Sequence, residues 1–256
     1  MLDPMIEKLK NEPVHTFASL VEIMRLLRSD GGCPWDREQT HESIRSNLIE
    51  ETYEVIEAID TKDSALLREE LGDVLLQVVF HARISEEDGD FSIDGVIHDV
   101  CAKLIHRHPH IFGSVQADTS EEVLANWEAI KTEEKNRVGL GGTLAAIPPS
   151  LPALMYAQKI IKKAGKYQAS PGEDSALEAL AAARQAPSPA EAVEKLLLGA
   201  AVIAQNNNLD SEEILHHACR RISTSLAEAE NSELWQESVG ADSSRRKLSE
   251  KVFFGE

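Results

Sequence analysis

The sequence contains little cysteine, few aromatic residues and no long apolar segment. Its three cysteines, Cys33, Cys101 and Cys219, stand far apart and form no Cys-x-x-Cys pair, which argues against a disulfide framework or a zinc ribbon. No run approaches the roughly 20 apolar residues that a membrane-spanning helix needs. The first residues also lack the apolar core of a signal peptide. We therefore expect a soluble, cytoplasmic protein that has reduced thiols and no contact with a membrane.

Basic residues are also in deficit. The chain has 26 Lys and Arg against 44 Asp and Glu, so its formal net charge is −18. A surface of this sign repels the phosphate backbone, and we expect no binding to nucleic acid. A phosphorylated small molecule stays compatible with this charge if a metal ion and a few local cations offset the repulsion.

Strand signals are missing almost throughout the chain, and helical spacing of apolar residues replaces them. We therefore predict an all-α fold. In the first half the pattern predicts five helices: 16–27, 40–59, 64–85, one from after Phe91 to before Pro109, and one that Ser120 caps. A further helix is expected over "SEEILHHACRRISTSLAEAE" in the second half.

A segment rich in Gly and Pro, "VGLGGTLAAIPPSLP", separates the two halves of the chain. We interpret residues 138–152 as a linker between a first domain, 1–137, and a second helical domain, 153–256. A weak internal repeat relates "DVLLQVVFHA" to "LLLGAAVIAQ". The second domain would then be a degenerate copy of the first, because acidic residues are missing at the matching positions.

Carboxylates gather on two consecutive predicted helices. "NLIEETYEVIEAID" places four glutamates within eight positions, although like charges one turn apart repel. On the next helix Glu70 and Asp73 stand among apolar residues, and Gln77 and His81 continue their polar line. A helix that is apolar all round is normally buried, and a buried carboxylate is costly unless it is paired, protonated or bound to metal.

Two interpretations of these carboxylates follow from the residues alone. One is a solvated acidic face, which accounts well for Glu57. The other is a divalent cation between the helices, with two i, i+3 pairs as its ligands: Glu51, Glu54, Glu70 and Asp73. Carboxylate oxygens suit Mg²⁺, and Mn²⁺ is an alternative.

These motifs resemble the MazG family of all-α nucleoside triphosphate pyrophosphohydrolases. "EETYE" followed by "ELGD" fits the family's EExxE…ExxD pattern, and the flanking blocks agree in order: "GCPWDREQT", "RHPHIFG", "NWEAIKTEE" and "PSLPALMYAQKI". The resemblance covers roughly residues 17–163. It implies a MazG-like helical bundle in which the four acidic residues hold Mg²⁺. It further implies that Glu50 binds a second ion or orients the attacking water.

Six further residues are candidates for binding the substrate. Lys103 and Arg107 share one helix face at i, i+4 spacing and could meet phosphate oxygens, although ordinary exposed cations are the alternative. Trp35 and Trp127 could stack on a base, and core packing is their alternative. Two residues complete the set: Lys131, one turn after Trp127, and Asn47, on the carboxylate face.

The implied reaction is hydrolysis of a nucleoside triphosphate between its α and β phosphates, which yields a monophosphate and pyrophosphate. The resemblance also implies a homodimer and a role in the nucleotide pool, and we expect the second domain to serve dimerisation or stability. Two other classes stay open. One is a non-catalytic regulatory binder of nucleotides or proteins, and the other is a di-iron bundle, whose Glu-x-x-His motifs lie outside the acidic cluster here.

Overall fold

Helices make up the regular structure of the chain, as predicted. The computed structural model describes residues 4–134, 139–230 and 253, and no strand occurs within them. The chain divides into two compact units, residues 1–131 and 132–256. The boundary that we predicted after residue 137 falls outside the described residues, so the assignment of domains stays a prediction. No helix of the described residues is long and apolar enough to cross a membrane.

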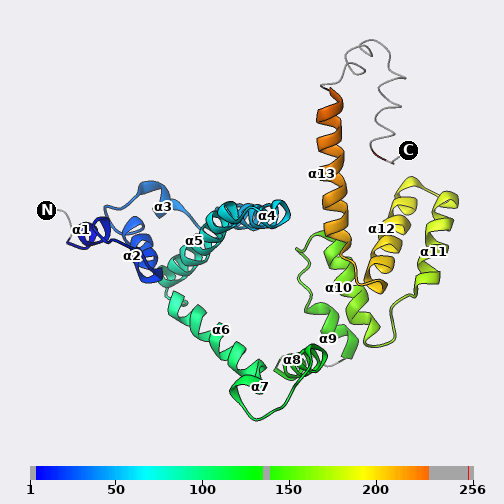
Figure 1. Cartoon of the computed structure of the whole chain (residues 1–256), viewed down its shortest axis with the longest axis horizontal. Coiled ribbons are helices and arrows are strands. Elements are labelled where there is room, and N and C mark those ends of the chain that lie inside the picture. Colours follow the sequence, from blue (N-terminus) through cyan, green and yellow to red (C-terminus); the bar gives the residue numbers. More distant parts are fainter. Residues whose placement is uncertain (1–3, 135–138, 231–252, 254–256) are drawn as a thin grey trace. The chain divides into compact units, whose positions relative to one another are not determined.

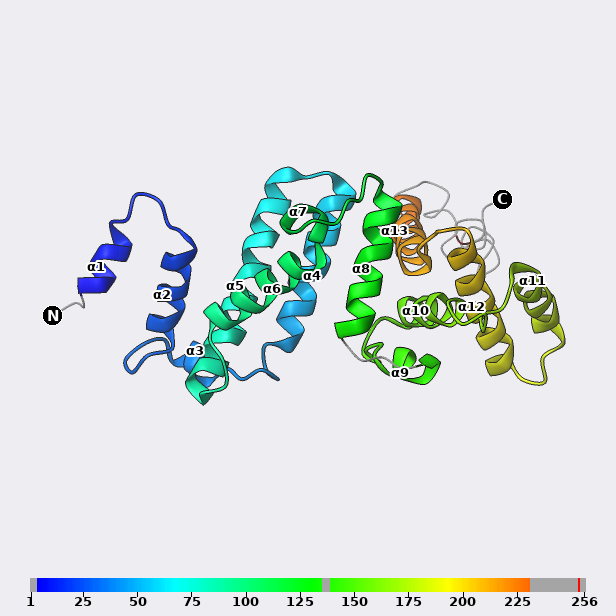
Figure 2. The same cartoon turned by 90° about the horizontal axis from the view of Figure 1, so that it is seen from below.

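The first unit is built around a hairpin of two long helices. Figures 1 and 2 show α4 (Arg45–Thr61) and α5 (Ser64–Asp88) side by side. The turn is short because Lys62 adopts a left-handed conformation with φ 57° at the end of α4. The Asp63 carboxylate then accepts hydrogen bonds from Ala65 N and Leu66 N, both at 3.0 Å. The remaining helices of this unit are α1 (Pro4–Lys10), α2 (Phe17–Leu27), α3 (Pro34–Glu38), α6 (Ile93–Arg107), α7 (Pro109–Phe112) and α8 (Ser120–Glu134).

The core of the first unit lies between α2, the start of α4 and the second half of α5. Its buried members are Met24, Ile44, Val79, Phe80 and Ile84. Val79, Phe80 and Ile84 come from α5, and Met24 and Ile44 pack against them. Burial of these apolar side chains fixes the position of that helix. The carboxylates lie in the first half of α5, away from this core in sequence.

Helix α4 begins later than we predicted. It starts at Arg45 rather than Thr40, and residues 41–44 form a turn. Two reciprocal hydrogen bonds hold this turn: Thr40 N donates to Ser43 Oγ at 2.9 Å, and Ser43 N donates to Thr40 Oγ1 at 3.3 Å. In the sequence, Thr40 and Ser43 have the spacing of a helix cap. In the structure, they hold a separate turn that precedes α4.

Helix α8 begins at Ser120, the residue that we predicted as its cap, so the helix starts one residue earlier and a different residue caps it. Glu122 N donates to Thr119 Oγ1 at 3.2 Å, so Thr119 rather than Ser120 satisfies the first turn.

The second unit contains α9 (Gly139–Ala145), α10 (Ala153–Gly165), α11 (Glu173–Ala182), a 3-10 turn (Ala183–Gln185), α12 (Pro189–Asn206) and α13 (Ser211–Glu230). Its core consists of Ile161, Ala176, Ala201 and Val202. Helix α9 lies within the segment that we interpreted as a linker. Thr143 is buried there, and its hydroxyl lies 3.0 Å from the Tyr167 hydroxyl, so contacts within the unit order a glycine-rich segment.

Candidate functional site

Helices α4 and α5 bring three carboxylates together. One carboxylate oxygen from each of Glu51, Glu70 and Asp73 lies within 4.8 Å of the others. Glu70 is buried, with 8% of its surface exposed, and the other two are half-buried. The hairpin therefore brings together three of the four carboxylates that the sequence suggested, and Glu54 is not part of this group.

The pKa values of the clustered carboxyl groups show that these groups repel one another. Burial raises the pKa of Glu51 above the usual range of a carboxyl group, and repulsion from Asp73 and Glu54 adds to this effect. Burial likewise raises the pKa of Glu70, with Glu54 and Asp73 as the next causes. Glu54, which is exposed, is thus coupled to both helices of the cluster.

No lysine or arginine of the described residues forms an ion pair with the four clustered carboxylates. Oxygen ligands of this kind and spacing fit a hard divalent cation, which would relieve the repulsion. We infer that Glu51, Glu70 and Asp73 fit such an ion, whereas the role of Glu54 as a fourth ligand stays a prediction.

Glu50 is exposed on α4. No contact places it in the cluster of three carboxylates. Its role therefore stays a prediction.

A second group of predicted residues meets at the end of α6 and on α8. The Arg107 guanidinium carbon lies 5.2 Å from the centre of the Trp127 ring, and Lys131 Nζ lies 4.2 Å from it. Arg107 is buried, with 7% of its surface exposed, so it is not the ordinary surface cation of the alternative interpretation. The Trp127 ring contacts two cations, which cation–π attraction favours.

Three predicted residues have no described contact with either group. Trp35 is 59% exposed at the start of α3, Asn47 is half-buried near the start of α4, and Lys103 is exposed on α6. Their roles in binding remain predictions.

The structure also reveals a polar line through the core that the sequence only hinted at. His41 Nδ1 lies 2.7 Å from His81 Nδ1, and Ser85 Oγ lies 3.2 Å from His41 Nε2. Asp73, Gln77, His81 and Ser85 follow each other at intervals of four on α5, so they share one face. The signal in the sequence was this spacing, but the contribution of His41 depends on the folded turn before α4.

Two atoms on this line are buried without a hydrogen-bond partner among the described residues, Gln77 Oε1 and His81 Nε2. Most buried polar atoms in proteins are hydrogen-bonded. Burial lowers the pKa of His81 below that of an ordinary histidine, and the nearby His41 lowers it further. Burial of these unpaired polar atoms therefore costs stability. The polar line connects the first half of α5, which carries the carboxylates, with the second half, which packs in the core.

Comparisons with known proteins agree with this geometry. Residues 39–112 match the model of the MazG nucleotide pyrophosphohydrolase domain. This range contains α4, α5 and α6, and so all the clustered carboxylates, Lys103 and Arg107. Trp35, Trp127 and Lys131 lie outside it.

Three relatives show how far the similarity extends. The nucleoside triphosphate pyrophosphohydrolase/pyrophosphatase MazG of Thermotoga maritima is 42% identical over 213 residues, which are 80% of this chain and 82% of the relative. The nucleoside triphosphate pyrophosphohydrolase of Escherichia coli K12 is 50% identical over 145 residues, or 56% of this chain and 55% of the relative. An uncharacterized protein of Bacillus subtilis, YabN, is 49% identical over 148 residues, or 58% of this chain, but the match spans 30% of YabN.

Replacement of a buried carboxylate should stabilise the chain when metal is removed. A carboxyl with a raised pKa binds more protons in the folded state than in the unfolded state, so stability falls as pH rises from about 4.5 through the folded pKa. We expect Glu70→Gln to raise the melting temperature in EDTA at about pH 7.5, and to raise it less near pH 4.5. Circular dichroism measures both values.

The matched control for this experiment is Glu69→Gln, because Glu69 is exposed beside Glu70 and repels it only weakly. Glu69→Gln should shift the melting temperature less than Glu70→Gln does. A lower melting temperature of Glu70→Gln in EDTA at neutral pH would contradict the repulsion that we describe.

The histidine pair should make the first unit sensitive to acid. Because the pKa of His81 is lowered in the folded state, the unfolded chain binds more protons, and stability is lost as pH falls below about 6.5. We expect His81→Gln to flatten the dependence of the melting temperature on pH between about 7.5 and about 5.5. The exposed His98, replaced in the same way, should leave the dependence unchanged. An equal dependence in the wild type and in His81→Gln would contradict this role of the pair.

Proposed function

The chain belongs to the MazG family of nucleotide pyrophosphohydrolases, and from this premise we propose that it hydrolyses nucleoside triphosphates to the monophosphate and pyrophosphate. The observation that carries the proposal is the convergence of Glu51, Glu70 and Asp73 within 4.8 Å, inside the matched domain. The same activity appears in the names of the Thermotoga maritima and Escherichia coli relatives. The match spans 82% of the Thermotoga maritima relative and 55% of the Escherichia coli relative.

We propose Mg²⁺ as the cofactor, with Mn²⁺ as a substitute, held by Glu51, Glu54, Glu70 and Asp73. When bound, the cation would supply positive charge that stabilises the phosphate oxygens and eases deprotonation of the attacking water. Ligands from two helices suit this role because the packed core fixes α5, and the hairpin turn fixes α4 beside it.

The remaining side chains have separate tasks in the proposal. Glu50 accepts the proton of the attacking water, which its exposed position on α4 permits. Water adds to the α- or the β-phosphorus as the α–β anhydride bond breaks. Pyrophosphate leaves with the electron pair of that bond if the α-phosphorus is attacked, and the monophosphate leaves with it if the β-phosphorus is attacked. Arg107 and Lys131 carry fixed positive charge beside Trp127 and would attract the triphosphate. Lys103, Trp35 and Asn47 are proposed as further contacts with phosphate, base or sugar.

We also propose that the chain acts as a homodimer. We predicted that α5 is buried all round, and this is wrong for the single chain: Leu71, Leu75 and Val78 are 52%, 40% and 37% exposed. Their spacing of four and three forms a stripe, and matching exposed stripes occur on α4 (Ile49, Tyr53, Ile56) and α6 (Ile97, Val100, Leu104). Apolar stripes on three consecutive helices are typical of a surface that another copy covers.

The activity assay measures pyrophosphate release from the eight common NTPs and dNTPs, in Mg²⁺ and in EDTA. We expect release in Mg²⁺ only. Glu54→Gln should abolish it, because the cluster loses a charged ligand. Glu50→Gln should lower kcat by about 100-fold or more while the affinity for Mg²⁺ persists.

Glu57→Gln is the matched control, because this glutamate lies on the same helix outside the cluster. It should retain near wild-type activity. If the folded, metal-loaded chain binds nucleotides but releases no pyrophosphate, the proposed hydrolysis is wrong and a regulatory binder replaces it.

The dimer can be tested by analytical ultracentrifugation. We expect the wild type to sediment as a dimer and Leu75→Arg/Val78→Arg to sediment as a monomer, because burial of two unpaired charges in an apolar interface is costly. Val14→Arg, at a site that is 73% exposed outside the three helices, should leave the dimer intact. A monomeric wild type would show that the exposed stripes serve another purpose.

A further inference from the structure

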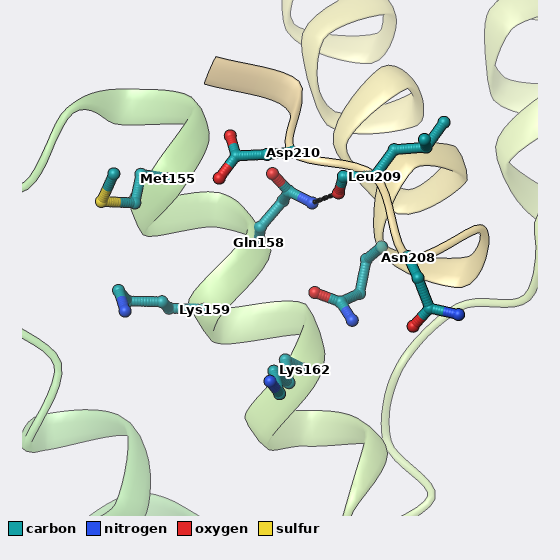
Figure 3. A pocket seen from close by; sticks show the side chains of 8 residues that line it. Met155, Gln158, Lys159, Lys162, Asn208, Leu209 and Asp210 are labelled. Carbon is teal, nitrogen blue, oxygen red and sulfur yellow. Dashed lines mark hydrogen bonds between the residues drawn. The ribbon is translucent and has the colours of Figure 1, made fainter. Parts of the chain in front are cut away.

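The second unit contains a pocket that belongs to none of the features described above. It lies between α10 and the loop that joins α12 to α13, and its volume is about 320 Å³. Figure 3 shows Met155, Gln158, Lys159 and Lys162 on α10 and Asn208, Leu209 and Asp210 on the loop, with Gln158 reaching across to Leu209. Gln205 at the end of α12 completes the lining. This volume is at the lower end of the range for small-molecule sites.

The wall of the pocket is fixed by hydrogen bonds. Gln158 is 9% exposed, and its Nε2 donates to the Leu209 carbonyl at 2.8 Å. Its Oε1 accepts from both the backbone N and the Oγ of Ser211, each at 2.7 Å. A single buried amide thus holds the α12–α13 loop against α10, so the pocket is largely formed before any ligand enters.

The charges of the lining favour an anion. Lys159 and Lys162 are one turn apart on α10, and neither forms an ion pair with another described residue. Both side chains are exposed, and like charges one turn apart on a helix repel each other. An anion between them would remove this repulsion.

The carboxylate of Asp210 already accepts two hydrogen bonds from backbone amides. Its Oδ1 accepts from Glu212 N at 2.9 Å and from Glu213 N at 3.1 Å, and so it caps the first turn of α13. Among the described residues, Asp210 is the one acidic residue that lines the pocket.

The remaining lining narrows the class of ligand. The amides of Gln205 and Asn208 add hydrogen-bond donors. The part of the chain that the structure describes contributes no aromatic ring to the lining, so it offers a nucleobase nothing to stack on. We propose that this pocket binds a compact phosphate-bearing anion through Lys159, Lys162 and Asn208. Orthophosphate, pyrophosphate and the phosphate of a nucleoside monophosphate share this chemistry. The site lies in the second unit, so it does not depend on catalysis by the carboxylates.

The test is isothermal titration of the full chain that carries Glu54→Gln, in EDTA and at low salt, so that binding at the carboxylates is suppressed. Orthophosphate, pyrophosphate and AMP are titrated separately. We expect saturable binding of at least one of them, and the arm that binds most tightly identifies the source of the phosphate. Lys159→Gln/Lys162→Gln should weaken binding by about tenfold or more, because two charge-assisted contacts are lost.

The matched control is Lys10→Gln/Lys195→Gln, which removes the same charge from two lysines that already pair with Glu7 and Glu191. It should leave the affinity within about twofold. Asn208→Asp is a second variant that keeps the lysines but adds a negative charge to the rim, and it should also weaken binding. Absence of binding by all three anions overturns the proposal, and so does equal binding by the lysine variant and its control.

Discussion

Mutual repulsion of carboxylates across the α4–α5 hairpin is the constraint on which the first unit depends. Glu51 and Asp73 face each other across the two helices, and Glu70 is buried beside them. Repulsion among these carboxylates raises the pKa values of Glu51 and Glu70, in addition to the effect of burial. The opposing force comes from the Lys62–Asp63 turn at one end and from apolar packing of α5 at the other. The interactions that stabilise the hairpin thus lie outside the site. The carboxylates can therefore repel one another in the absence of a cation without unfolding the unit.

The polar face of α5 joins these two regions. It leads from Asp73 through Gln77 to His81, where the helix enters the packed core. His41 comes from the turn directly before α4, so its contact with His81 ties the start of α4 to the middle of α5. Because α4 carries half of the carboxylates, a shift of this turn would move them relative to Glu70. The half-buried histidine pair is therefore well placed to fix the geometry of the site from a distance.

Local rules in the sequence predicted the helices and the carboxylate pairs, because spacing along one helix determines which residues share a face. These rules gave wrong predictions where contacts between distant parts of the sequence determine the structure. Helix α9 forms in a glycine-rich segment because Thr143 is buried and contacts Tyr167. Arg107 has the sequence pattern of a surface cation, yet it is buried beside Trp127. The apolar side chains of α5 predicted burial on all sides, which a single chain cannot provide.

The acidic surface and the local cations have complementary effects on anionic ligands. A formal net charge of −18 repels extended polyanions at a distance, whereas a small phosphate compound experiences mainly the charges nearest to it. Arg107 and Lys131 in one unit, and Lys159 and Lys162 in the other, are local exceptions to the overall sign. Because salt screens repulsion at long range more strongly than contact between adjacent charges, selectivity for compact phosphates should depend on the ionic strength. The distribution of charge, rather than its total, thus decides which anions such a protein admits.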